Sequence, residues 1–186
     1  MESKRLFLAI EADDDIAAIA EEIKAANSHL AGLRWAKTGD LHVTLCFLGE
    51  TPEEKIPEVK DKITRLHKHF MPLELKNPVF CKVSGNRGSG MLWLKFDNCN
   101  CFARMVMHSY RSLLNAKPDH TPTPHVTLAR FKNDILSIDM LNREYKYSKI
   151  FTGIALFESV LTPHGTEYIL LEKFGFNNRV LGNNKF

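Results

Sequence analysis

The stretch Leu41-His42-Val43-Thr44-Leu45-Cys46-Phe47-Leu48 contains the pattern His, any residue, Thr, apolar residue. The same pattern returns later in the chain as His125-Val126-Thr127-Leu128. Both copies stand in apolar runs that contain β-branched or aromatic residues, a composition typical of buried strands. Side chains two positions apart on a strand share a face, so the histidine and threonine of each copy should point the same way. We therefore predict two strands that each present an imidazole beside a hydroxyl.

The bulk composition is that of an ordinary globular protein of 186 residues, with 25% charged and 10% aromatic residues. This length predicts one domain, or one domain with two lobes. The net charge of +3 slightly favours a phosphate-bearing partner. No apolar run approaches the roughly 18 residues of a membrane span, and the amino terminus does not resemble a secretory signal. With four cysteines and no paired C-x-x-C arrangement, we interpret the protein as cytoplasmic, with reduced thiols.

The hydrophobic periodicity predicts an α+β chain. Three helices are expected, over residues 13–28, 52–71 and 102–115, with a further short helix over Asp134 to Leu141. Strands are expected over residues 5–11, 33–36, 41–49, 73–84, 91–97, 150–161 and 166–174, and at the second His-x-Thr motif. The first motif strand is expected to end at Gly49. After it, Thr51-Pro52-Glu53-Glu54 predicts a capping box at the start of the second helix.

The two halves of the chain follow a similar order. Each gives a strand, a helix, a His-x-Thr strand, a helix or helical turn, and a further strand. We therefore predict a single domain of residues 1–186 with two similar lobes, each supplying one His-x-Thr strand to a shared cleft. The glycine-rich segment of residues 85–90 is either a hairpin tip or a nest of backbone amides that could meet a phosphate.

Two histidines that face one cleft can divide acid and base roles, because imidazole titrates near neutral pH. Hydroxyl groups and arginines suit phosphate oxygens. This set of groups is what an in-line displacement at a phosphodiester requires without a metal: one histidine activates the attacking oxygen and the other protonates the leaving oxygen. A metallohydrolase is disfavoured, since only two histidines converge and no acidic ligands lie at motif spacing.

The chain resembles the 2H phosphoesterase superfamily, and most closely the bacterial and archaeal RNA 2′,3′-cyclic phosphodiesterases, also called 2′-5′ RNA ligase-like proteins. The resemblance covers nearly the whole chain. It rests on the two motifs with their flanks and on these further segments: Arg5-Leu6-Phe7, Arg34-Trp35, Glu158-Ser159 and Leu161-Thr162-Pro163-His164-Gly165-Thr166-Glu167-Tyr168.

The resemblance implies a bilobal α+β fold of mainly antiparallel sheet with flanking helices, pseudo-twofold symmetry and a central cleft. It implies an enzyme that opens RNA 2′,3′-cyclic phosphate termini to 2′-phosphates, with no cofactor and no metal. By position, His42 and His125 are the catalytic pair, with His42 as acid and His125 as base, while Thr44, Thr127 and Arg130 bind the phosphate.

Arg130 is five residues from its motif histidine, so a regular strand would aim it away from the cleft, and a bulge or strand end must bring it round. His120 and His164 are interpreted either as structural or exposed residues or as contacts at the cleft rim. The expected partners are RNA 3′ ends or cyclic-phosphate oligonucleotides, acted on by a monomer. Two other functions fit the same residues: an RNA-end binding protein, and a reversible 2′-5′ RNA ligase with weak hydrolysis.

Overall fold

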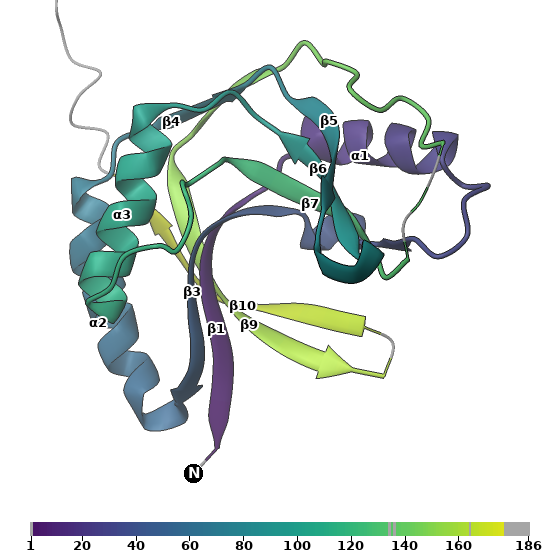
Figure 1. The fold of residues 1–186 in the computed structure, drawn as a ribbon. Coiled ribbons are helices and arrows are strands. Elements are labelled where there is room, and N and C mark those ends of the chain that lie inside the picture. The colour runs from purple at the N-terminus through teal and green to yellow at the C-terminus, as the bar shows by residue number, and fades with distance from the viewer. Residues whose placement is uncertain (1, 134, 136, 164, 177–186) are drawn as a thin grey trace, which may run out of the picture.

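A sheet of eight strands forms the centre of the computed structural model, which describes residues 2–133, 135, 137–163 and 165–176 (Figure 1). The strands run in the order β10-β9-β1-β3-β7-β6-β5, and β2 pairs with β7. Their bounds are β1 (Ser3–Glu11), β2 (Arg34–Trp35), β3 (His42–Pro52), β5 (Val79–Ser84), β6 (Gly90–Lys95), β7 (His125–Phe131), β9 (Gly153–Thr162) and β10 (Gly165–Gly175). A separate ladder joins β4 (Leu73–Lys76) to β8 (Ser148–Phe151). All these pairs are antiparallel, so the predicted α+β class with a mainly antiparallel sheet is confirmed.

In the described part of the chain, three α-helices accompany the sheet: α1 (Asp14–Ala26), α2 (Ile56–Leu66) and α3 (Asn100–Leu114). Helix α1 starts where Asp13 Oδ1 accepts a hydrogen bond from the Ile16 N–H at 3.0 Å, which satisfies one of the free amides of the first turn. Helix α3 starts at Cys99, whose Sγ accepts from the Phe102 N–H at 3.3 Å. The helices predicted over residues 13–28 and 102–115 are therefore confirmed.

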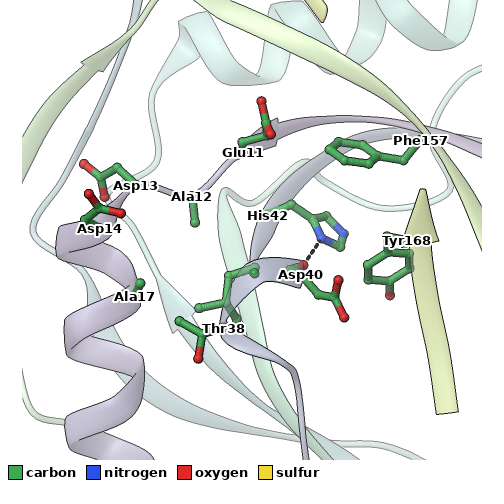
Figure 2. A pocket seen from close by; sticks show the side chains of 12 residues that line it. Glu11, Ala12, Asp13, Asp14, Ala17, Thr38, Asp40, His42, Phe157 and Tyr168 are labelled. Atoms are coloured by element: carbon green, nitrogen blue, oxygen red, sulfur yellow. Dashed lines mark hydrogen bonds between the residues drawn. The ribbon is translucent and has the colours of Figure 1, made fainter. Parts of the chain in front are cut away.

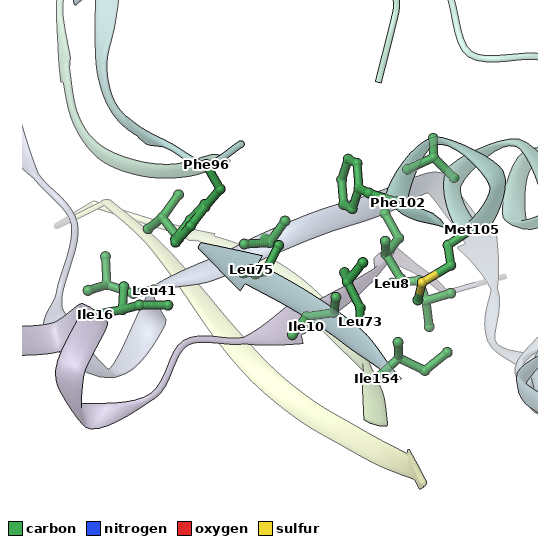
Figure 3. Close-up of a cluster of buried hydrophobic side chains, with 14 of the residues drawn as sticks. Leu8, Ile10, Ile16, Leu41, Leu73, Leu75, Phe96, Phe102, Met105 and Ile154 are labelled. Atoms are coloured by element: carbon green, nitrogen blue, oxygen red, sulfur yellow. The ribbon is translucent and has the colours of Figure 1, made fainter. Parts of the chain in front are cut away.

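Helices and strands from both halves of the chain share one hydrophobic core (Figure 3). Leu8 and Ile10 of β1, Ile16 of α1, and Phe102 of α3 are at most 1% exposed in it. Burial of a side chain of this size contributes about 1.5–3 kcal/mol. The core lies on the sheet face that receives the valines of the two His-x-Thr motifs, so the histidines and threonines are left to the other face.

The two halves of the sheet meet at one residue pair, Val43 of β3 with Val126 of β7. Helices then tie the halves together. Helix α1 precedes β3, yet the buried side chain of Asn27, at the end of α1, bonds the backbone of Asp139, which follows β7, at 2.9 and 3.1 Å. Helix α3 packs against β3 and α2 of the other half. We interpret these halves as the two predicted lobes.

Strand β3 does not end at Gly49, and the capping box predicted after it is wrong. The strand continues to Pro52 because β1 pairs with it as far as Ser3. Gly49 instead follows a bulge and has a φ of 75°, a conformation that favours glycine. The Thr51 hydroxyl donates to the Gly49 carbonyl at 3.3 Å, and α2 begins only at Ile56.

Two further predictions of secondary structure are corrected. The single strand expected over residues 73–84 is divided into β4 and β5, because Asn77 has a φ of 48° and the proline after it has no N–H to donate. The helix expected over 134–141 is absent from the described part of that segment. Ser137 and Met140 have positive φ values of 60° and 62°, which interrupt a helix, while residues 134 and 136 lie outside the described residues.

The glycine-rich segment is a hairpin tip, as one of its two readings predicted. Strands β5 and β6 pair on either side of it, from Ser84 with Gly90 onwards. Its amides are used within the turn, since the Gly85 N–H donates to the Ser89 carbonyl at 2.7 Å and the Ser89 N–H to the Asn86 carbonyl at 3.1 Å. These two amides are therefore engaged within the turn and are not available to a phosphate.

Candidate active site

The pairing of Val43 with Val126 brings the two motifs side by side. Directly paired residues of antiparallel strands point to the same face, and here both valines are buried in the core, 1% and 0% exposed. The residues on either side of each valine must then point to the opposite face. The structure therefore gathers all four predicted motif side chains on one face of the sheet: His42, Thr44, His125 and Thr127.

Both motif histidines are held in the same way. His42 Nδ1 lies 2.7 Å from the Asp40 carbonyl oxygen, and His125 Nδ1 lies 2.8 Å from the Thr123 carbonyl oxygen. A carbonyl can only accept, so Nδ1 carries the proton in both rings. Neither Nε2 has a hydrogen-bond partner among the described residues, so each can accept a proton when its ring is neutral and donate one when it is charged. Nε2 is therefore the atom of each ring that can exchange a proton with a substrate.

Burial is the main influence on the protonation of these rings, and it lowers the pKa of both His42 and His125 from the usual histidine value. The hydrogen bonds to the two carbonyls oppose this effect. The positive charge of Arg130 lowers the pKa of both rings, and His42 also lowers the pKa of His125. The charge of Arg130 acts on both rings, and the two rings repel each other when both are charged. These effects favour the state in which only one ring is protonated.

The threonines of the motifs are half-buried on the same face. Within the part of the chain that the structure describes, neither hydroxyl of Thr44 or Thr127 has a hydrogen-bond partner. Each hydroxyl can therefore donate to an oxygen of a bound phosphate without breaking a bond of the fold.

Arg130 reaches the same face through a bulge in β7, as its odd spacing required. Thr127 pairs with Trp93 and Ala129 pairs with Leu92, which leaves Leu128 as an extra residue between them. Leu128 and Ala129 are consequently both buried, and Arg130 returns to the histidine face. Its guanidinium is exposed, and its only hydrogen bond in the described residues is from Nη1 to Met91 Sδ at 3.0 Å.

Strand β3 has a bulge at the corresponding place. Thr44 pairs with Ala9 and Cys46 pairs with Leu8, which leaves Leu45 as the extra residue. Phe47 then occupies the position that Arg130 has in the other motif, and its side chain is 59% exposed. The second motif is thus followed on this face by the charged Arg130, and the first motif by the exposed ring of Phe47.

The aromatic residues around the histidines were not predicted from the sequence. Trp93 of β6 stacks on His125 with ring centroids 3.6 Å apart and an interplanar angle of 19°. Its Nε1 is buried without a partner among the described residues. His42 has instead Phe7 at 4.8 Å and Tyr168, edge-on, at 5.0 Å. Only the Arg5-Leu6-Phe7 and Tyr168 segments of the resemblance pointed to any of these rings.

A pocket of about 220 Å³ opens on one side of His42 (Figure 2). Phe157, Tyr168 and His42 form its aromatic side, and Glu11 and Asp40 are among the carboxylates around it. Burial raises the pKa of Asp40, yet the group of carboxylates as a whole would repel an anion. We therefore expect a phosphate to bind on the other side of His42, between the two motifs and near Arg130.

The remaining sequence predictions are placed as follows. His120 is exposed in the loop before β7, and His164 lies outside the described residues, so their place at the rim stays a prediction. Among the residues that the structure describes, no three His, Cys, Asp or Glu side chains form a group that could hold a metal ion. No helix in the described ranges is long and apolar enough to cross a membrane. All four cysteines are free.

The chain is similar to known proteins over most of its length. A family model described as LigT-like phosphoesterase matches residues 7–93. An RNA 2′,3′-cyclic phosphodiesterase from Aquifex aeolicus is 29% identical over 189 residues, covering 94% of this chain and 98% of the relative. One from Thermus thermophilus is 28% identical over 186 residues, covering 91% and 89%.

Solved structures show the same fold. The crystal structure of a Thermus thermophilus protein superposes with a TM-score of 0.79 at 28% identity, covering 92% of this chain and 97% of that one. E. coli LigT in complex with NADP+ superposes with a TM-score of 0.74 at 22% identity, covering 94% and 99%.

Proposed function

We propose that the chain is a LigT-like phosphoesterase that hydrolyses 2′,3′-cyclic phosphate ends of RNA to 2′-phosphates in the cytoplasm, as a monomer. The observation that carries this proposal is the Val43–Val126 pair, which sets two identical His-x-Thr units against each other on one face of the sheet. Phosphodiester hydrolysis needs a base on the attacking side and an acid on the leaving side, and this arrangement supplies one histidine for each.

The phosphate is placed between the two units. The hydroxyls of Thr44 and Thr127 donate to its non-bridging oxygens, and Arg130 compensates the charge that develops on them. Phe47, exposed on the same face, suits stacking with a base of single-stranded RNA. No step of this scheme draws on a metal, so we expect activity to survive exhaustive treatment with EDTA. Loss on chelation with recovery on adding a divalent ion would contradict the scheme.

The roles of the histidines follow the family resemblance. His42, charged, protonates the leaving 3′-oxygen through Nε2, and His125, neutral, takes a proton from water through its own Nε2. A substrate with an activated phenolate leaving group needs no acid. On that substrate His42→Ala should recover much of its rate while His125→Ala stays slow. The opposite pattern would exchange the roles, and equal impairment would leave neither assignment standing.

A panel of small substrates tests the reaction itself. It contains 2′,3′-cyclic, 3′,5′-cyclic and 2′-5′-linked compounds, and the phosphate position in each product is read by ³¹P NMR. We expect only the 2′,3′-cyclic compounds to be opened efficiently, with the phosphate on the 2′-oxygen. Tight binding without turnover would favour an RNA-end binding protein. Formation of 2′-5′ linkages from a cyclic end and a 5′-hydroxyl, faster than hydrolysis, would favour a ligase.

A further inference from the structure

Arg34 and Arg130 lie directly opposite each other across strands β2 and β7. The next pair, Trp35 with Ala129, packs against the hydrophobic core. Successive residues of a strand point to opposite faces, so both arginines project from the face that carries the motif histidines. Cα atoms of directly paired residues lie about 4.5–5.5 Å apart, which brings two guanidinium groups to one edge of the cleft.

The two like charges have no counter-charge in the part of the chain that the structure describes. Many other cations are paired there, for example Lys37 with Glu167 at 3.0 Å and Arg143 with Glu22 at 2.8 Å. Neither Arg34 nor Arg130 contacts a carboxylate among the described residues, and both are exposed. Like charges at directly opposite positions destabilise a sheet. An anion from outside the chain would remove that cost.

The two arginines differ in their distance from the reacting centre. Burial first, and then the charge of Arg130, lower the pKa of both His42 and His125. Arg34 is not among the charges that act on either ring. Arg130 therefore lies close to the reacting rings, and Arg34, on the neighbouring strand β2, lies beside Arg130.

We propose that Arg34 binds a second phosphate of the substrate, the internucleotide phosphate next to the terminal cyclic phosphate at Arg130. This inference rests on the proposed function and narrows its substrate class to oligonucleotide ends. A guanidinium group recognises phosphate through two parallel N–H···O bonds, and this geometry suits a phosphodiester that is held beside the first one. Mononucleoside 2′,3′-cyclic phosphates without a 5′-phosphate would leave Arg34 unused.

The test compares a dinucleotide that ends in a 2′,3′-cyclic phosphate with the matching mononucleoside 2′,3′-cyclic phosphate. Arg34→Gln should lower the ratio of their kcat/KM values about tenfold, because one charge-assisted phosphate contact is lost only with the dinucleotide. Arg104→Gln is the matched control, since Arg104 is exposed on α3, which packs on the opposite face of the sheet, and it should leave the ratio unchanged. Thermal unfolding confirms that both variants fold.

The proposal is overturned if Arg34→Gln leaves the ratio of the dinucleotide kcat/KM to the mononucleoside kcat/KM unchanged. This holds whether the two kcat/KM values fall together or both stay at the wild-type level. Binding provides a readout that does not depend on turnover. The Kd of a dinucleotide ending in a 2′-phosphate is measured by calorimetry against that of the mononucleoside 2′-phosphate. If no cyclic phosphate is opened at all, the proposed function fails. A dinucleotide-specific loss of binding in Arg34→Gln would then still support the second phosphate site, and equal binding would refute it.

Discussion

Replacing Trp93 with leucine removes the indole on which His125 lies, and this should change both the orientation and the protonation of the ring. The ring centroids are 3.6 Å apart, close enough for a stacking contribution of about 0.5–1.5 kcal/mol. A loss of about 1 kcal/mol from the stacked orientation corresponds to a factor of about five in its population. We therefore expect kcat to fall about fivefold while KM stays unchanged, because the phosphate contacts are untouched.

The sign of the pKa change follows from the charge of the imidazolium. An indole face attracts a cation by about 0.5–1 kcal/mol, which corresponds to about 0.4–0.7 of a pKa unit. Burial lowers the pKa of His125, and we expect the stacked indole to oppose that effect, because it favours the charged ring. Trp93→Leu should therefore lower the pKa of His125 further, and the limb of the pH–rate profile that reports this ring should move to lower pH.

NMR titration of the His125 ring protons measures both effects. In the wild type the ring current of the indole should shift these protons upfield, and the shift should disappear in Trp93→Leu. Trp35→Phe is the control, since Trp35 is the other tryptophan and packs against the core. If the pKa of His125 and the value of kcat are both unchanged in Trp93→Leu, the stacked ring does not position the histidine.

Three further predictions concern the sheet, the cleft and helix α1. Gly90→Ala should lower the free energy of unfolding in urea by about 1–3 kcal/mol, because a Cβ there would lie 2.4 Å from the Val83 carbonyl oxygen and 2.5 Å from Phe131 Cζ. If the urea midpoint of unfolding is the same in Gly90→Ala and the wild type, the close packing around Gly90 is contradicted. Burial, and then the Arg130 charge, lower the pKa of both motif histidines, so Arg130→Gln should move both limbs of the pH–rate profile to higher pH. If both limbs of the pH–rate profile stay at the same pH in Arg130→Gln, Arg130 does not lie in the cleft. Burial raises the pKa of Asp13, but hydrogen bonds from a backbone N–H and a lysine lower it overall, so its charge stabilises the fold above its unfolded pKa of about 4. The Tm difference between wild type and Asp13→Asn should therefore be present at pH 7 and vanish as pH falls below 4. A difference independent of pH would refute this.

The site was predictable where local rules decide the geometry. Strand periodicity alone places each motif histidine on the face of its threonine. The odd spacing of Arg130 required a bulge, and the bulge lies at Leu128. Alternation on a strand is a property of the backbone, so one sequence suffices to detect a departure from it.

The surroundings of the motifs were not predictable, because they depend on which strands become neighbours. Trp93 reaches His125 only through the register of β6 against β7, and Tyr168 reaches His42 from β10, across β9 and β1. The capping box at Thr51 was wrong for the same reason. Its residues had the local signature of a helix start, but pairing with β1 kept them in the strand.

The measurement that tests the account most directly is the kcat/KM of His42→Ala, His125→Ala and the double variant on an RNA oligonucleotide with a 2′,3′-cyclic phosphate end. Each single variant should lose about 10²–10⁴-fold, and the loss in the double variant should fall short of the product, because the two rings act as one unit. His108→Ala, on the exposed surface of α3, should retain full activity. If either single variant keeps activity within about threefold of the wild type, the two-histidine mechanism is contradicted.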